Sequence, residues 1–160
     1  MTRSKVDTSS VDALADAVLT ASRLLVAVSA RSIAASGDTI TLPQFRALVV
    51  LQSRGPMKLT TLAEHLGVNP STATRTVDRL LALEMVARQP NPASRREVVI
   101  ELSESGRKLV RDVTRRRRAA IRKIVERMPE DQRQGLVDAL AAFTAAGGEP
   151  AVNGSDPGWV

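Results

Sequence analysis

The sequence contains no cysteine, and this absence excludes several kinds of chemistry. Without thiols the chain forms no disulfide, senses no oxidant through cysteine and holds no zinc through sulfur ligands. The only histidine is His65, which lies in a predicted helix where a packing or surface role is favoured over catalysis. We also find no phosphate-binding glycine loop, metal-ligand cluster or nucleophile elbow. The sequence therefore predicts a protein that is not an enzyme and that carries neither a metal nor a cofactor.

Aromatic residues are scarce, with no tyrosine, two phenylalanines and one tryptophan. Proteins that bind single-stranded DNA or RNA usually stack bases on aromatic side chains. Both phenylalanines occupy positions suited to a core, and Trp159 lies in the C-terminal tail. The composition therefore argues against a single-strand or RNA binder and favours recognition of a duplex through arginines and hydroxyls.

Long uninterrupted apolar runs are also absent, since none reaches the length that spans a membrane. Asp12, Asp16 and Arg23 interrupt the first apolar segment, which argues against a signal peptide. We therefore expect a cytoplasmic protein with no membrane partner.

Positive charge is in excess and unevenly distributed. The net charge is +6, and residues 75–127 carry 15 Lys and Arg against 7 Asp and Glu, so the rest of the chain is negative. This excess indicates a polyanionic partner, although a basic balance alone fits a membrane surface as well. The 160 residues, 43% of them hydrophobic, are enough for about one globular domain assisted by dimerisation.

The centre of the chain predicts two short helices joined by a tight turn. Thr61-x-x-Glu64 has the spacing of a capping box at a helix start. Gly67 follows where a helix commonly ends in a left-handed residue, and Asn69-Pro70 supplies the N-cap and first residue of a second helix. Apolar residues at helical spacing complete the first helix: Leu62, Ala63 and Leu66.

The second helix of the pair is expected to run from about Pro70 to Leu83. At about 100° per residue, Ala73, Val77 and Leu80 share one face. The opposite face carries polar residues: Ser71, Thr72, Arg75, Asp78 and Arg79. Hydroxyls and a helix N-terminus suit phosphate oxygens, whereas an arginine can donate two hydrogen bonds to a guanine edge. An ordinary solvated face would look the same, and the turn in front of the helix favours DNA recognition.

A basic hairpin, or wing, is predicted to follow. Residues 85–88 have strand character, residues 89–95 form a Pro-containing loop, and residues 96–102 alternate as a half-buried return strand. The loop end carries Arg95 and Arg96, which we expect to reach a flanking minor groove or its phosphates. A surface hairpin with two arginines is common by itself, but beside a recognition helix it predicts a DNA clamp.

The middle of the chain, from about Leu42 to Gly106, resembles the MarR family of bacterial transcriptional regulators. The resemblance is carried by Leu42-Pro-Gln-Phe-Arg-Ala-Leu, Leu62-Ala-Glu-His-Leu-Gly-Val, Ser71-Thr-Ala-Thr-Arg-Thr-Val-Asp-Arg-Leu and Arg95-Arg-Glu-Val-Val-Ile-Glu-Leu-Ser-Glu-Ser-Gly. It implies a homodimer, a palindromic operator and often release of DNA by a small ligand. The residues expected to contact DNA are Thr61, Ser71, Thr72, Thr74, Arg75, Arg79, Arg95 and Arg96.

Two positions depart from the family's usual pattern. Ser94 stands where the family usually has an acidic residue two positions before the minor-groove arginine, so Arg96 is expected to lack an orienting carboxylate. Glu84 stands where the family favours glycine after the recognition helix. A non-glycine residue in a left-handed cap costs roughly 1 kcal/mol, unless the helix ends differently.

Helical patterns flank this region, so the predicted fold is mainly α with a small β-hairpin. Between Val11 and Val28 an apolar residue recurs every three or four positions, which is typical of a seam that packs another helix. Ser103 is placed to cap a long helix that ends near Met128, and Pro129 opens a last helix. The predicted organisation is a flexible N-terminus (1–10), a helical dimerisation region (11–36 and 103–146), a winged helix-turn-helix DNA-binding domain (37–102) and a disordered tail (147–160).

Four successive arginines, Arg115 to Arg118, interrupt the apolar stripe of the long helix. Because four residues sweep about 300° of a helix, at least one must approach the seam, where it needs an acidic partner or an anionic ligand. Pairing with a carboxylate is the favoured interpretation, since arginines more often pair with carboxylates than define a site.

Together these patterns predict a sequence-specific regulator that binds double-stranded DNA. We expect it to act as a ligand-responsive repressor and as a homodimer on a palindromic operator, with no ligand-binding residue assigned to a small-molecule effector. Two alternatives stay open because the sequence separates them poorly from the first. They are a non-specific DNA-coating protein and a winged-helix module that binds other proteins.

Overall fold

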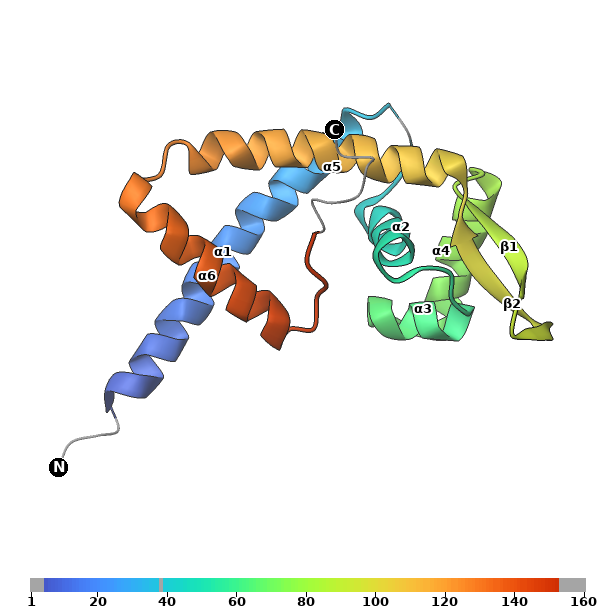
Figure 1. Cartoon of the computed structure of the whole chain (residues 1–160), viewed down its shortest axis with the longest axis horizontal. Helices are drawn as coiled ribbons and strands as arrows, with labels where there is room; N and C mark the ends of the chain where they lie inside the picture. The colour runs from blue at the N-terminus through green and yellow to red at the C-terminus, as the bar shows by residue number, and fades with distance from the viewer. Residues whose placement is uncertain (1–4, 38, 153–160) are drawn as a thin grey trace.

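The computed structural model describes residues 5–37 and 39–152 (Figure 1). These residues are mostly helical with one two-stranded antiparallel hairpin, which confirms the predicted fold class. In chain order the elements are α1 (Lys5–Ala34), α2 (Leu42–Arg54), α3 (Leu59–Leu66), α4 (Pro70–Ala82), β1 (Val86–Asn91), β2 (Ser94–Leu102), α5 (Glu104–Val125) and α6 (Glu130–Ala146).

Helix α5 runs along the molecule and connects two parts of different character (Figure 1). On one side α2, α3, α4 and the β1–β2 hairpin form what we call the winged-helix lobe, residues 42–102. On the other side lie α1, whose C-terminal end packs against α5, and α6, which runs from the far end of α5 back toward the lobe. The buried core joins α2, α4 and the hairpin to the first half of α5. Its members include Phe45, Leu48, Val77, Leu80, Ile100, Leu109 and Val113.

The start of α3 differs from the prediction. The helix begins at Leu59 with Lys58 as its N-cap, and no side chain caps its first amides. Thr61 lies inside the first turn, so the predicted Thr61–Glu64 capping box is wrong. The reason lies in the tertiary structure, because Met57 and Ile100 exchange two backbone hydrogen bonds of 3.1 and 2.8 Å. This bridge fixes the incoming chain, and the helix starts two residues after it.

Local signals place the remaining boundaries of the helix-turn-helix correctly. Gly67 ends α3 in the left-handed conformation with φ 66°. At the start of α4, the Thr72 N–H donates a hydrogen bond of 2.9 Å to Asn69 Oδ1, and Pro70 is the first helical residue. The helix ends at Ala82, within a residue of the predicted end.

The chain between α4 and α5 contains a left-handed residue, which is one of the two alternatives left open for Glu84. Glu84 has φ 57° and is the only non-glycine residue with positive φ among those described. Its carbonyl accepts a hydrogen bond of 2.6 Å from the Ser103 hydroxyl, which in turn accepts one of 3.0 Å from the Gly106 N–H. One hydroxyl therefore ties the end of the recognition helix to the capped start of α5.

Gly106 marks the closest approach of α5 to the chain that leaves α4. A Cβ atom at this position would lie 2.1 Å from the backbone oxygen of Met85 and 3.1 Å from Leu102 Cδ2. Because a backbone atom would have to move, we expect Gly106→Ala to lower the free energy of unfolding by about 1–3 kcal/mol. Urea denaturation followed by circular dichroism measures this change.

Gly135→Ala is the matched control, since a Cβ added to Gly135 in α6 meets nothing within 4 Å. There the better helix propensity of alanine is expected to raise stability by up to about 1 kcal/mol. Similar effects of the two substitutions would contradict the close approach at Gly106.

The two ends of the chain also differ from the prediction. Helix α1 begins at Lys5 rather than near Val11, because no glycine or proline interrupts residues 5–34. The rest of the N-terminus predicted to be flexible lies outside the described residues. Within the predicted disordered tail, Gly148 and Glu149 form hydrogen bonds with α2, whereas residues 153–160 lie outside the described residues.

Candidate nucleic-acid interface

Helix α4 turns its apolar face into the lobe and its polar face outward, as predicted. Ala73, Val77 and Leu80 are at most 1% exposed. The guanidinium groups of Arg75 and Arg79 lie on the exposed face, and neither forms an ion pair with any described residue. Two unpaired arginines one turn apart can therefore approach a polyanion without breaking an existing contact.

Hydroxyl groups surround the N-terminus of α4. Asn69 Oδ1 accepts from the Thr72 N–H and from the Ser71 hydroxyl, the latter at 2.7 Å. The Thr74 hydroxyl donates to the Pro70 carbonyl at 2.8 Å. The protons of Ser71 and Thr74 are thus engaged within the protein, while the first-turn amides and the helix dipole favour an anion here. Of the predicted set, only Thr61 lies on another helix, half-buried in α3.

The wing is a tighter hairpin than predicted. Strands β1 and β2 pair in one register from Val86–Leu102 to Pro90–Val98, and the register then shifts so that Asn91 pairs with Ser94 and residues 95–97 have no partner in the β1–β2 ladder. The loop predicted over residues 89–95 is therefore wrong, since only Pro92 and Ala93 lie between the strands. Pro90 stands at this register shift, and strands tolerate proline at bulges. Arg95 and Arg96 lie at the start of β2, exposed and close to the turn.

The expected alternation along the return strand holds only in part. Ile100 and Leu102 are buried, but Val98 is 53% exposed and Val99 is 8% exposed. Val98 pairs with Pro90 beside the register shift of the hairpin and is not part of the buried core. The adjacent pair Val99 and Ile100 is buried because the base of the hairpin is covered on both faces.

Among the described residues, acidic side chains fix the wing to the rest of the lobe and do not pair with Arg95 or Arg96. Glu97 accepts hydrogen bonds from the Lys58 ammonium and from Asn91 Nδ2. The hydrogen bond from Lys58 lowers the pKa of the Glu97 carboxyl, which therefore stays ionised. On the other strand, Arg88 pairs with Asp78 of α4 at 3.2 Å. Neither contact has a local signature, since the partners are distant in sequence, so sequence patterns did not reveal them.

Arg95 and Arg96 form no ion pair within the described part of the chain. This agrees with the expectation that Ser94, which replaces the family's usual acidic residue, leaves Arg96 without an orienting carboxylate. The lobe consequently presents four unpaired, exposed arginines, two on α4 and two on the wing. A surface of this kind attracts the phosphates of nucleic acid.

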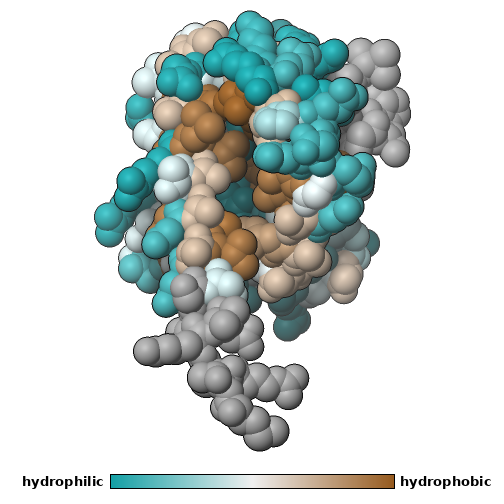
Figure 2. All heavy atoms as spheres, turned by 90° about the vertical axis from the view of Figure 1, so that its left-hand side faces the viewer, coloured by the Kyte–Doolittle hydropathy of each residue, from teal (hydrophilic) through white to brown (hydrophobic). Residues whose placement is uncertain are grey.

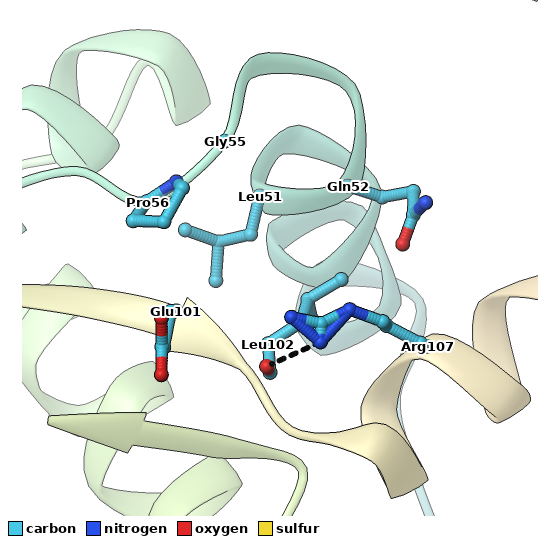
Figure 3. A pocket seen from close by; sticks show the side chains of 7 residues that line it. All are labelled: Leu51, Gln52, Gly55, Pro56, Glu101, Leu102 and Arg107. Atoms are coloured by element: carbon cyan, nitrogen blue, oxygen red, sulfur yellow. Dashed lines mark hydrogen bonds between the residues drawn. The ribbon is translucent and has the colours of Figure 1, made fainter. Parts of the chain in front are cut away.

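Two hollows on the lobe differ in size. One of about 160 Å³ lies between the end of α2, β2 and the start of α5 (Figure 3). Figure 3 shows Arg107 reaching into it from α5, with Nη1 donating to the Leu102 carbonyl at 3.1 Å. This volume is below the roughly 300–1,000 Å³ typical of sites for drug-sized ligands. A second hollow, of about 350 Å³, separates Arg79 from the start of α2 at Thr41 and Gln44.

A different surface, on α1 and α6, is apolar. No residue of α6 is buried, and Val137, Leu140 and Phe143 are 48–60% exposed. On α1, Val11 and Leu14 are 62% and 65% exposed. Figure 2 shows apolar side chains gathered around a hollow on this side of the molecule. An exposed apolar surface of this extent indicates an interaction site.

The apolar character of α1 also bears on the expectation of no membrane partner. Within the described residues, Ser10–Ala34 is long and apolar enough to cross a membrane by length and composition, despite the charges at Asp12, Asp16 and Arg23. A helix whose apolar face packs on a partner chain passes the same test. The exposed apolar residues of α1 are therefore compatible with either a membrane or a partner chain as the surface that covers them.

Comparison with known proteins places these features in a family. The model of the MarR family matches residues 40–98. Over 100 residues the chain is 31% identical to the uncharacterised HTH-type transcriptional regulator ML2140 of Mycobacterium leprae, covering 62% of this chain and 70% of that protein. It is 38% identical over 71 residues to the HTH-type transcriptional repressor NicR of Pseudomonas putida, covering 44% of this chain and 45% of NicR.

Among solved structures, the crystal structure of RV1404 from Mycobacterium tuberculosis superposes on this chain with a TM-score of 0.83. The two are 56% identical, and the match covers 90% of this chain and 98% of RV1404. The similarity therefore extends beyond the winged-helix lobe to the terminal helices.

Proposed function

Because this chain belongs to the MarR family of HTH-type transcriptional regulators, we propose that it binds a palindromic operator as a homodimer and represses the promoter there. The observation that carries the proposal is the outward face of α4, where Arg75 and Arg79 are exposed and unpaired. The repressor NicR, a relative in the same family, supports repression over activation.

The homodimer is supported by the uncovered apolar face of α1 and α6. Burial stabilises by about 25 cal/mol per Å² of apolar surface, and these side chains obtain no such burial within one chain. A second copy offers the same face, so a two-fold axis lets both copies cover each other. We accordingly assign dimerisation to residues 11–36 and 103–146 and DNA binding to residues 37–102.

In the proposed complex the two α4 helices enter successive major grooves on one side of the duplex. A two-fold dimer reads half-sites about 34–36 Å apart, one helical turn of DNA. Arg75 and Arg79 contact base edges or phosphates, and the set of supporting contacts is Thr61, Ser71, Thr72 and Thr74. Arg95 and Arg96 on the wing contact the flanking minor groove or its phosphates. A promoter covered in this way is closed to transcription.

The remaining parts of the proposal follow from the family. A small-molecule effector that changes the separation of the two lobes would release DNA, because both α4 helices must match the pitch of the duplex. No residue is assigned to that effector. The protein acts in the cytoplasm, as a DNA-binding regulator requires, and needs no enzymatic activity.

Competition binding tests the proposal against its alternatives. Fragments selected from genomic DNA by the purified protein should share one palindrome, bound about a thousand-fold or more tightly than random duplex at the same salt concentration. Equal affinity for random duplex would indicate a DNA-coating protein. Absence of duplex binding at moderate salt would indicate a protein-interaction module instead.

The wing supplies a separate prediction. Arg96→Ala is expected to weaken binding to operator and random duplex by a similar factor, because a phosphate contact carries no sequence information. The slope of log affinity against log salt should become shallower by about one unit, as one phosphate contact is lost. Binding titrations at several salt concentrations measure both quantities.

Arg122→Ala is the control for this measurement, since Arg122 lies near the far end of α5 and pairs with Glu126. It removes the same charge from the chain without touching the wing. A salt slope that falls equally in both variants, or in neither, would exclude the wing from the DNA contact.

A further inference from the structure

The C-terminal end of α6 is attached to α2 by arginine side chains. Arg46 donates two hydrogen bonds to the Glu149 carboxylate, Nη1 to Oε1 at 2.9 Å and Nη2 to Oε2 at 3.0 Å. Arg54 Nη2 donates to the Gly148 carbonyl at 2.9 Å. A paired fork of this kind fixes both the distance and the orientation of the carboxylate. We call residues 147–149 the C-terminal segment.

Polar contacts also hold the beginning of α6. Arg133 Nη2 donates to the carbonyls of Glu126 and Met128, each at 3.1 Å, at the end of α5. Between these two attachments α6 has no buried residue. In a single chain the helix is therefore positioned by its ends rather than by apolar packing along its length (Figure 1).

One of the four successive arginines places a positive charge, without a partner among the described carboxylates, at the junction of α2 and α5. An anion is needed there to balance this charge. Arg117 is half-buried, and its buried Nε has no hydrogen-bond partner. Burial, followed by repulsion from Arg46, lowers the pKa of the Arg117 guanidinium. Arg115 is exposed and pairs with Asp112 at 2.9 Å. Arg117, the arginine that approaches the seam, has no carboxylate partner among the described residues, so the pairing predicted for it is wrong.

The Glu149 carboxylate is the anion beside Arg46 and Arg54 of α2. The hydrogen bond from Arg46 lowers the pKa of Glu149 in spite of the opposing effect of burial, so the carboxylate stays ionised. Arg46 and Glu149 remain 46% and 43% exposed, which leaves the pair open to water. A contact so exposed can break and re-form without unfolding the lobe.

We propose that the C-terminal segment is a tether between α6 and the winged-helix lobe, and that Arg46, beside Arg117, forms a carboxylate site whose resident ligand is Glu149. At its C-terminal end, α6 is then held to the lobe by the Arg46–Glu149 ion pair together with the Arg54–Gly148 hydrogen bond. Where α6 contributes to the dimer, the same ion pair restricts the separation of the two lobes. This last step, and only this step, rests on the proposed function.

The absence of cysteine allows a direct test. Cysteines introduced at Glu64 in α3 and Ala142 in α6, both exposed, carry spin labels whose separation is measured by pulsed electron paramagnetic resonance. Labelled chains are diluted into an excess of cysteine-free chains so that only the intrachain distance contributes. We expect one narrow distance in the wild-type background and a clearly broader distribution in Glu149→Gln, which removes the charge and keeps the shape.

Two further variants identify the ion pair as the cause. Glu149→Arg should broaden the distribution, and Arg46→Glu combined with Glu149→Arg should restore a narrow one, because the swapped charges can pair again. Glu126→Gln, which breaks the exposed Arg122–Glu126 pair, is the control and should leave the distance unchanged. An equally narrow distribution in Glu149→Gln, or no recovery on swapping, would overturn the tether.

The DNA-binding step is measured separately with the same variants. We expect Glu149→Gln to change operator affinity by about five-fold or more while the charge-swapped variant returns toward the wild-type value. A broadened distance with unchanged affinity would overturn the coupling to DNA. The distance is recorded without DNA, so the distance measurement tests the tether even if the proposed function is wrong. An error in the proposed function would be recognised separately, because the wild-type protein would then not bind operator DNA.

Discussion

Leu140→Glu is expected to separate the dimer and to remove most operator binding. Leu140 lies on the uncovered apolar face of α6 and is 48% exposed in the single chain. A carboxylate there costs little in the monomer but would be buried without a partner in the dimer. Such a charge costs about 3 kcal/mol or more, which corresponds to roughly 150-fold weaker dimerisation. Each separated chain then holds one half-site alone.

Sedimentation velocity at micromolar concentration measures the assembly state, and titration of operator DNA measures its consequence. Ala142→Glu is the matched control, since Ala142 is exposed on the opposite side of the same helix and carries the same new charge. It should leave the dimer intact. If Leu140→Glu remains dimeric at the wild-type concentration, the apolar face of α6 is not the dimer contact.

Local patterns were enough to predict the recognition helix. Asn69-Pro70 defines its start, and the spacing of Ala73, Val77 and Leu80 defines its buried face, because capping and amphipathic periodicity act within a few residues. The left-handed conformation of Glu84 is one of two alternatives that the comparison with the family's usual glycine left open. These features agree with the structure because tertiary packing reinforces the local preference rather than opposing it.

Predictions failed where distant residues decide the local structure. The capping box at Thr61 was overridden by the bridge between Met57 and Ile100, which are more than 40 positions apart and set the start of α3. The wing loop was predicted too long because it contains proline, whereas Pro90 pairs with Val98 beside a register shift, where a strand tolerates proline. Propensity cannot reveal either contact before the fold is known.

The contacts of the candidate sites also divide into those that follow from local sequence and those that depend on distant residues. The exposed arginines of α4 follow from periodicity, but the pairing of Arg46 with Glu149 joins residues 103 positions apart. Because four successive residues cover most of the circumference of a helix, the sequence predicted that one residue of the run Arg115 to Arg118 approaches the packed seam of α5. The structure identifies this residue as Arg117. Its lack of a carboxylate partner among the described residues could not be foreseen from charge counts.

Arg75→Ala is expected to lower operator affinity by about 1–3 kcal/mol and to relax the base preference at one position of each half-site. The side chain is exposed on α4 and forms no ion pair with a described residue, so its loss should leave the melting temperature unchanged. The effect then belongs to DNA binding and not to folding. Titrations against the operator, single-base variants of it and random duplex measure the change.

Arg75→Lys separates a base contact from a phosphate contact. Lysine keeps the positive charge but cannot offer the planar pair of donors that matches a guanine edge. If Arg75 contacts a base, the lysine variant should retain the salt dependence of the wild type and lose discrimination among the single-base variants. Equal losses on operator and random duplex for Arg75→Ala, with full discrimination in Arg75→Lys, would instead make Arg75 a phosphate contact and leave base recognition to other residues of α4.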